Sequence, residues 1–159
     1  MKLGVVSDSH DNVPKVSKAI DLLKSQGIQM LIHLGDYVSP FSLRPILEAG
    51  LEFIGVFGNN DGDKLALQRV SKGQILDSPR IELIYGKRVF LSHQLPYFEA
   101  LGKSGEFDLI LFGHTHEPYL KRGSGCLILN PGELGGWLYG RTSMAIVDLD
   151  KMDAEIIDV

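Results

Sequence analysis

Cysteine is nearly absent from this sequence of 159 residues, in which Cys126 is the only one. A single cysteine cannot form an intrachain disulfide or a zinc site built from several thiolates, so a reducing compartment fits best. Long hydrophobic runs are also missing, because no apolar segment approaches the roughly 20 residues of a membrane-spanning helix. The apolar run at residues 3–6 is too short for the core of a signal peptide. We expect a soluble, cytoplasmic protein.

Basic segments are missing too. The chain has 16 Lys and Arg and 20 Asp and Glu, which gives a formal net charge of −4. Long nucleic acids attract strongly basic surfaces, so they are disfavoured as partners. Small phosphorylated substrates remain open, because a bound metal ion can reverse the charge of a local site. The length suits one domain, and 44% hydrophobic with 23% charged residues is ordinary for globular proteins. We expect a single domain over residues 1–159.

The order of apolar segments predicts an α/β fold. Buried strands at residues 2–7, 30–34 and 52–57 alternate with helices at 14–27 and 40–49, which is typical of parallel βαβ units. In the second half, residues 80–85 and 88–92 flank Gly86 and Lys87 as a hairpin. A helix at 96–103 and strands at 109–112, 119–121, 126–130, 144–148 and 154–159 follow. We expect a parallel first half and a mainly antiparallel second half.

Polar side chains stand where several of these predicted strands end. In an open parallel sheet, ligands bind beyond the carboxyl ends of the strands, so these side chains should converge on one edge. Histidine nitrogens, carboxylates and an amide oxygen suit borderline divalent metal ions. Gly35, Gly58 and Gly113 directly precede three of these residues and permit sharp turns there. The candidate site residues are Asp8, His10, Asp36, Asn59, His93, His114 and His116.

Each of these residues also has an ordinary structural interpretation when it is taken alone. Asp8 and Asp36 could cap helices that follow the strands. Asn59 beside Gly58 is typical of a turn, and each histidine could be a surface or satisfied core residue. The ordinary interpretation is disfavoured for the whole set, because it would have to account for all seven residues at once.

Three further residues are interpreted differently. His33 lies inside the predicted strand at 30–34, so a core or supporting position is favoured over metal ligation. Cys126 stands in an apolar strand and is expected to be inert. Asp61 could cap a helix that begins near Lys64 or could orient a ligand, and the cap is favoured.

Four residues of the C-terminal third are also ambiguous. Trp137 and Tyr139 lie in a glycine-rich stretch and could stack on a substrate base, cover the core or join an oligomer interface. Arg141 and Lys121 could clamp a phosphate, although solvated surface charge is the favoured interpretation.

Five short blocks, each at a predicted strand end, resemble the signature blocks of the calcineurin-like metallophosphoesterases. They occur in the same order, and the match runs from Asp8 to about Gly132. Together with the spacing, the Asn-Pro-Gly segment at 130–132 resembles the small prokaryotic phosphodiesterases of that superfamily. The blocks are Ser7-Asp8-Ser9-His10, Gly35-Asp36, Gly58-Asn59-Asn60-Asp61, Ser92-His93 and Gly113-His114-Thr115-His116.

The resemblance implies a fold and a role for each candidate residue. The implied fold is α/β, with two mixed β-sheets packed as a sandwich and flanked by helices in a four-layer αββα arrangement. Asp36 would bridge two metal ions through its carboxylate. The first ion would be held by Asp8, His10 and His116, and the second by Asn59, His93 and His114.

The implied activity is hydrolysis of phosphodiester bonds by attack of a metal-bridging hydroxide on phosphorus. Mn²⁺ is the metal that the resemblance favours, and the donor set also accepts Zn, Fe, Co or Ni. The implied partner is a small phosphodiester substrate, with neither long nucleic acid nor a membrane involved. Oligomeric state is open, and analogy favours a homodimer.

The sequence departs from the superfamily pattern at three places. Many members carry a histidine that assists the leaving group where this chain has Asn60, and an amide cannot donate a proton as a general acid. Gln94 and Leu95 follow His93, where small relatives often show a second histidine. Glu133 follows the Asn-Pro-Gly segment, where serine is more usual.

Three other functions compete with a phosphodiesterase. One retromer subunit resembles this family and works mainly as a scaffold, but a scaffold has no need for the full set of seven ligands. A phosphomonoesterase is the second alternative, because the charge of such a site does not separate diesters from monoesters. A nuclease acting on long polymers is disfavoured by the acidic balance.

Overall fold

The computed structural model describes residues 1–123 and 125–159. The helices of these residues are α1 (Val13–Ser25), a 3₁₀ turn at Pro40–Leu43, α2 (Arg44–Glu48), α3 (Lys64–Val70) and α4 (Phe98–Gly102). The strands are β1 (Lys2–Val6), β2 (Met30–His33), β3 (Glu52–Val56), β4 (Ile75–Leu76), β5 (Arg80–Ile84), β6 (Lys87–Ser92), β7 (Leu109–Phe112), β8 (Tyr119–Arg122), β9 (Leu127–Asn130), β10 (Ser143–Asp148) and β11 (Asp153–Asp158).

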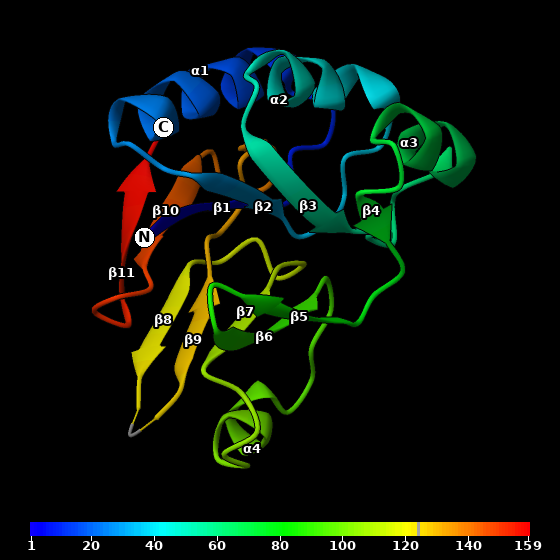
Figure 1. Ribbon diagram of the computed structural model, residues 1–159. Helices are drawn as coiled ribbons and strands as arrows, with labels where there is room; N and C mark the ends of the chain where they lie inside the picture. Colours follow the sequence, from blue (N-terminus) through cyan, green and yellow to red (C-terminus); the bar gives the residue numbers. More distant parts are fainter. Residues whose placement is uncertain (124) are drawn as a thin grey trace.

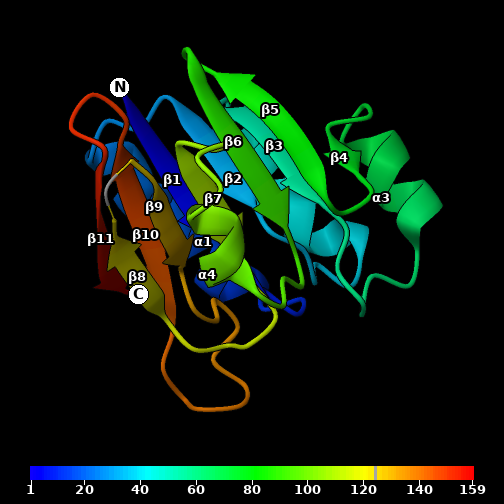
Figure 2. The ribbon, with the colours of Figure 1, turned by 90° about the horizontal axis from the view of Figure 1, so that it is seen from below.

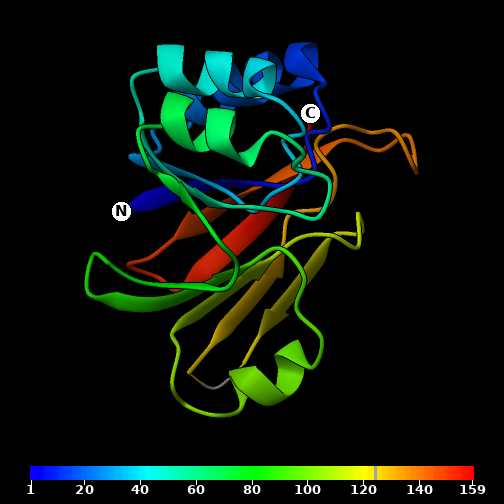
Figure 3. The same cartoon turned by 90° about the vertical axis from the view of Figure 1, so that its right-hand side faces the viewer.

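These elements form four layers (Figures 1 and 3). Within the described residues, one sheet has six strands in the order β11-β10-β1-β2-β3-β4, and the other has five in the order β5-β6-β7-β9-β8. Helices α1, α2 and α3 cover the outer face of the first sheet, and α4 lies against the outer face of the second (Figure 1). The expected sandwich of two mixed sheets flanked by helices is confirmed.

The strand directions confirm the expectation for both halves of the chain and add a parallel centre to the second sheet. Strands β1, β2 and β3 are parallel, as the βαβ pattern predicts. The second half is mainly antiparallel, as predicted, in the pairs β5–β6, β8–β9, β1–β10 and β10–β11, although β6, β7 and β9 pair in parallel inside the second sheet. The segment containing α4 makes a crossover from β6 to β7, which is the connection that parallel strands require.

The hairpin between β5 and β6 turns at Tyr85 and Gly86, one residue earlier than expected. Both residues have positive φ, 48° and 81°, which is the geometry of a two-residue turn whose twist matches that of the strands. Ile84 and Lys87 are therefore the last paired residues of the hairpin.

Local sequence explains where the helices begin. The Asn12 side chain accepts a hydrogen bond from the Lys15 backbone N–H, and Pro14 occupies the first turn of α1. The single helix expected at 40–49 is instead a 3₁₀ turn followed by α2. Pro45 lacks the N–H that a continuous helix would donate to Phe41, so the helix restarts at Arg44. The short edge strand β4 was not expected.

Among the residues that the structure describes, three apolar clusters hold the layers together. Leu3 and Ile32 of the first sheet pack with Leu91 and Leu129 of the second in the cluster between the sheets. A second cluster joins the first sheet to α1, α2 and α3, and a third joins α4 to the second sheet. The core therefore fixes the two sheets face to face, which sets the relative position of the loops at their ends. No helix in the described ranges is long and apolar enough to cross a membrane.

Candidate metal centre

All seven candidate side chains lie at one end of the sandwich. Loops after β1, β2 and β3 carry four of them, and loops after β6 and β7 carry the other three. The backbone N–H of His114 donates to Asp8 Oδ2 at 3.0 Å, and His93 Nδ1 lies 2.7 Å from the Leu34 carbonyl. These two contacts connect loops of different sheets, so the site is built at the junction between the layers.

Four of the donors form a compact cluster, in which one ligand atom from each residue lies within 4.8 Å of all the others. Asp8 Oδ1 is 3.4 Å from His116 Nε2 and 3.9 Å from His10 Nε2. Asp36 Oδ2 is 3.5 Å from His10 Nε2. The rings of His10 and His116 stack with centroids 5.2 Å apart.

The remaining donors surround the Asn59 amide. Asn59 Oδ1 lies 2.8 Å from His93 Nε2 and 2.9 Å from His114 Nδ1. His93 Nε2 is also 3.5 Å from Asp36 Oδ2. The same carboxylate oxygen of Asp36 is therefore equally distant from His10 in the first group and His93 in the second.

The buried groups of the cluster fit a divalent cation. Asp8 Oδ1 and His10 Nε2 are buried and have no hydrogen-bond partner among the described residues. Burial raises the pKa of the Asp8 carboxyl above its ordinary value, while nearby His93 and His116 lower it. A buried, unpartnered acceptor costs about 1–3 kcal/mol, and a metal ion is the partner that satisfies a carboxylate and imidazoles together.

The backbone at the cluster is held in an uncommon conformation. Left-handed φ angles occur at Asp8 (53°), His10 (42°), Asp36 (58°), His114 (70°) and His116 (61°). For residues other than glycine, such conformations cost on the order of 1–3 kcal/mol and concentrate at functional sites. The surrounding loops maintain them, as where the His10 N–H donates to the Asp36 carbonyl at 3.0 Å.

The three glycines that precede candidate residues have two different roles. Gly35 has a φ of +102°, as expected for a sharp turn. At Gly58 and Gly113 the requirement is close approach instead. A Cβ at Gly58 would collide with the Asp36 backbone and carboxylate, and one at Gly113 would lie 2.9 Å from Asp8 Oδ2.

Asp61 is not the helix cap that the sequence favoured, because Asp63 caps α3 by accepting from the Ala66 N–H at 3.1 Å. The buried Asp61 carboxylate instead accepts from the backbone N–H groups of Gly58 (2.6 Å), Asp36 (3.1 Å) and Val38 (2.8 Å). Burial is the main cause of a raised pKa at Asp61. The carboxylate joins the loops after β2 and β3 and supports Asp36.

Asn60 also contacts Asp36. Its backbone N–H donates to Asp36 Oδ1 at 2.8 Å, and its side-chain amide donates to Asp36 Oδ2 at 2.9 Å. Neither Asp8 nor Asp36 caps a helix, since Asn12 and Ser39 are the capping residues of the elements that follow them.

Two supporting residues were not assigned by the sequence. The buried Glu133 carboxylate has Oε2 3.3 Å from His116 Nδ1. The Asn130 amide donates to the Gly113 carbonyl and to Thr115 Oγ1, both at 3.0 Å, and so fixes the loop after β7. The only signal for Glu133 was its departure from the serine that is usual at this position.

His33 supports the site and is not among the clustered donors. It is fully buried, and its ring stacks on Tyr37 with centroids 3.9 Å apart. Nδ1 accepts from the Gly35 N–H at 3.2 Å, and Nε2 lies 2.9 Å from Ser9 Oγ. These contacts define a neutral imidazole that donates from Nε2. Burial, and then the charges of His93 and His10, hold its pKa well below the ordinary value.

The ambiguous charged and aromatic residues lie on the surface. Arg141 Nε pairs with Asp158 Oδ1 at 2.7 Å, and both side chains are exposed, so solvated charge is confirmed for Arg141. Trp137 and Tyr139 are 65% and 62% exposed, which excludes a role in covering the core.

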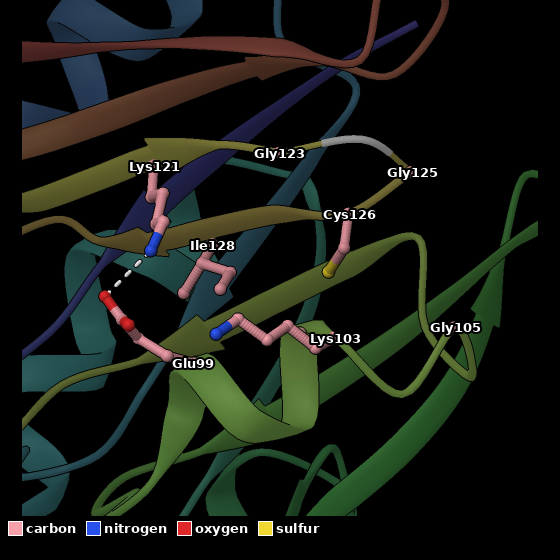
Figure 4. A pocket seen from close by; sticks show the side chains of 9 residues that line it. Glu99, Lys103, Gly105, Lys121, Gly123, Gly125, Cys126 and Ile128 are labelled. Atoms are coloured by element: carbon pink, nitrogen blue, oxygen red, sulfur yellow. Dashed lines mark hydrogen bonds and ion pairs between the residues drawn. The ribbon is translucent and has the colours of Figure 1, made fainter.

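A cavity of about 400 Å³ lies between α4 and the strands β8 and β9, and none of the candidate metal-centre residues lines it (Figure 4). Cys126, Lys103 and Lys121 line it, and Lys121 Nζ pairs with Glu99 Oε1 at 2.9 Å. Burial raises the pKa of the Cys126 thiol, which favours its protonated form. These features agree with the sequence, which predicts an inert thiol at Cys126 and a solvated surface charge at Lys121.

The chain belongs to the calcineurin-like phosphoesterase superfamily, whose domain model matches residues 1–152. It is therefore a phosphoesterase of that family, with a cluster of histidines and aspartates that can hold metal.

Individual relatives agree with this family assignment. The phosphodiesterase MJ0936 of Methanocaldococcus jannaschii is 32% identical, over 96% of each chain. The phosphodiesterase YfcE of Escherichia coli is 28% identical, over 84% of this chain and 79% of the relative. The structure of an archaeal phosphodiesterase superposes with a TM-score of 0.90 at 32% identity and covers the full length of both chains. Vps29 of Entamoeba histolytica, at 18% identity and a TM-score of 0.71 over 99% of each chain, shares the fold.

Proposed function

We propose that this protein is a binuclear metal-dependent phosphodiesterase. The observation that carries the proposal is the position of Asp36, whose Oδ2 lies 3.5 Å from both His10 Nε2 and His93 Nε2. A carboxylate between two sets of nitrogen and oxygen donors is suited to bridge two cations. Asp8, His10 and His116 would complete one site, and Asn59, His93 and His114 the other.

Two divalent ions bound here would supply a nucleophile derived from water and positive charge for the phosphoryl oxygens. The protein holds the donors ready, since Asp61 and Asn60 fix the Asp36 carboxylate and Glu133 contacts His116. Mn²⁺ is the native ion that we propose from the family, with Zn, Fe, Co and Ni as alternatives.

A phosphodiester is favoured over a monoester by two observations. The relatives at 32% and 28% identity are both named phosphodiesterases. Beside Asn59 and His93, a cavity of about 270 Å³ is lined by Ser78, Pro79 and Gln94 among others. This cavity offers a place for an ester substituent next to the second donor set.

The leaving group receives little help from Asn60. Its backbone and side-chain N–H groups both donate to Asp36, and an amide cannot act as a general acid. General-acid assistance contributes about 10²–10⁴-fold in rate, so its absence matters most for poor leaving groups. We therefore expect rates that fall steeply as the pKa of the leaving group rises.

The experiment is a panel of substrates assayed with each metal after chelator treatment. Bis(p-nitrophenyl) phosphate should be hydrolysed faster than p-nitrophenyl phosphate, and the activity should return only with a divalent transition metal. Asp36→Asn should lose activity and metal content more severely than His116→Ala, because Asp36 contacts both donor sets. Metal binding without any hydrolysis would instead support the scaffold, and faster monoester hydrolysis would support a phosphomonoesterase.

A further inference from the structure

The segment between β9 and β10 projects from the end of the sandwich at which the loops of the metal centre lie (Figures 2 and 3). It carries three consecutive large apolar residues, Trp137, Leu138 and Tyr139, whose exposed fractions are 65%, 65% and 62%. Three adjacent exposed apolar side chains are unusual on a surface unless they contact something.

Trp137 is fixed against the metal centre from two sides. Its indole Nε1–H donates to the His10 carbonyl at 3.2 Å, and its backbone N–H donates to Glu133 Oε1 at 2.6 Å. The Leu138 N–H donates to Glu133 Oε2 at 3.2 Å. The indole is therefore held at one edge by the backbone of a candidate metal ligand, while most of its surface is open to solvent.

Glu133 connects this loop to a second candidate ligand. Its carboxylate is buried, and Oε2 lies 3.3 Å from His116 Nδ1. The loop is thus tied to His10 through the indole and to His116 through Glu133. A ring held at its Nε1 edge, on a backbone that Glu133 also holds, has fewer positions relative to the candidate metal centre, which lowers the entropy cost of stacking a ligand on it.

We propose that Trp137 is the stacking platform for a planar aromatic substituent of the substrate, which makes nucleoside and aryl phosphodiesters the preferred class. The inference rests on the proposed phosphodiesterase function and specifies its substrate. Stacking of a base on an aromatic side chain is sequence-tolerant, because every base presents a π-face. The cavity beside Asn59 and His93 would take the other substituent.

Fluorescence gives a direct test, because Trp137 is the only tryptophan in the chain. Zn²⁺-loaded protein is titrated with AMP and, as a matched ligand without a base, with ribose 5-phosphate. AMP should quench the emission saturably, and ribose 5-phosphate should not. Equal responses to the two ligands would overturn the stacking platform without involving catalysis.

Calorimetry of AMP binding extends the test to variants. Trp137→Ala should weaken AMP binding by about 5- to 150-fold, which corresponds to the loss of about 1–3 kcal/mol when a stacking aromatic is removed. Trp137→Phe should recover part of the loss. Tyr139→Ala, which removes an equally exposed aromatic residue of the same loop, is the control and should bind AMP like the wild type.

Kinetics separate the subsite from the proposed function. Thymidine 5′-(p-nitrophenyl phosphate) and ethyl p-nitrophenyl phosphate release the same leaving group and differ in the retained substituent. Trp137→Ala should raise KM for the thymidine ester several-fold more than for the ethyl ester. If the wild type hydrolyses neither ester, the proposed phosphodiesterase function is wrong. If it hydrolyses both and the variant raises both KM values equally, only the stacking platform is wrong.

A dimer that Trp137→Ala dissociates, without a selective effect on AMP, would place the loop between two copies.

Discussion

Asp61 shows how one buried carboxylate can position a candidate metal ligand without being one. It accepts the backbone N–H groups of Gly58, Asp36 and Val38, so removing it leaves buried donors without partners. Asp61→Ala should lower the free energy of unfolding by at least about 1–3 kcal/mol. It should also weaken metal binding by about 10- to 100-fold, as is typical for groups that orient a ligand. Urea unfolding and metal titration measure the two effects.

Asp63 provides the matched control for Asp61, because it is an aspartate two residues away with a different contact. It caps α3 through the Ala66 N–H. Asp63→Ala should cost about 1 kcal/mol of stability and leave metal affinity as in the wild type. Equal metal affinities for Asp61→Ala and Asp63→Ala would show that Asp61 does not support the centre.

His33 should make the stability of the metal-free protein depend on pH. Its pKa in the fold is held well below the unfolded value of about 6.5, chiefly by burial. Below pH 6.5, His33 binds a proton in the unfolded chain but stays neutral in the folded chain. The stability that is present at higher pH is therefore lost as the pH falls. Between pH 7.5 and 5.5, His33→Gln should lose about 1 kcal/mol less than the wild type.

Unfolding in denaturant at the two pH values measures this difference. The two proteins differ only at residue 33, so the comparison isolates the contribution of His33. Metal content is the second measurement, and His33→Gln should still bind two ions per chain. Loss of one ion by a folded variant would make His33 a ligand.

At the scale of elements, the site depends on loops that approach one another so closely that only glycine fits at the point of contact. The loop after β7 passes the end of β1 at Gly113, where a Cβ would collide with Ser7 Oγ and lie 2.9 Å from Asp8 Oδ2. Gly113→Ala should cost about 1–3 kcal/mol of stability through overpacking, and it should weaken metal binding by displacing Asp8. Calorimetric metal titration and urea unfolding test both effects.

Gly62→Ala is the control for Gly113→Ala, because a Cβ there meets nothing within 4 Å and φ lies outside the left-handed region. This change should be neutral or should stabilise by up to about 1 kcal/mol, since it restricts the unfolded chain. Similar losses for both variants would indicate that glycine flexibility, and not close approach, matters at these loops.

The elements that carry the candidate residues could be predicted, because apolar strands and the polar residues at their ends are local features. The supporting contacts could not. Asp61 and Asp63 are both plausible caps before α3, and only the packing of the loop after β2 decides which one turns inward. The parallel pairing of β7 with β9 likewise depends on where β8 folds back, which no local pattern records.

The contact of Glu133 with His116 is the clearest example of a feature that the sequence does not predict. An acidic residue after Asn-Pro-Gly is ordinary in a loop, and nothing nearby in the chain indicates that it contacts His116. The contact arises because the segment after β9 passes the end of β1, where the Gly135 N–H donates to the Asp8 carbonyl at 2.9 Å. It therefore follows from tertiary structure alone.

At the scale of the whole molecule, the candidate donors come from both sheets. Asp8, His10, Asp36 and Asn59 follow strands of the first sheet, and His93, His114 and His116 follow strands of the second. An ion held by Asp8, His10 and His116 would connect the two layers, as would one held by Asn59, His93 and His114. Metal binding should therefore stabilise the sandwich as a unit and not one loop alone.

This coupling predicts a higher midpoint of thermal unfolding with metal than with chelator. A metal ion at 100 times its Kd adds about 2.7 kcal/mol to the free energy of unfolding for each site that the unfolded chain lacks. Circular dichroism follows both sheets, and Trp137 fluorescence follows the loop beside His10, so the two transitions should coincide and shift together. Asp36→Asn should lose most of the shift, and Asp63→Asn, outside the site, should keep it. A fluorescence shift without a change in the dichroism midpoint would show that metal orders only the loops, and the two sheets would then owe their association to the apolar core alone.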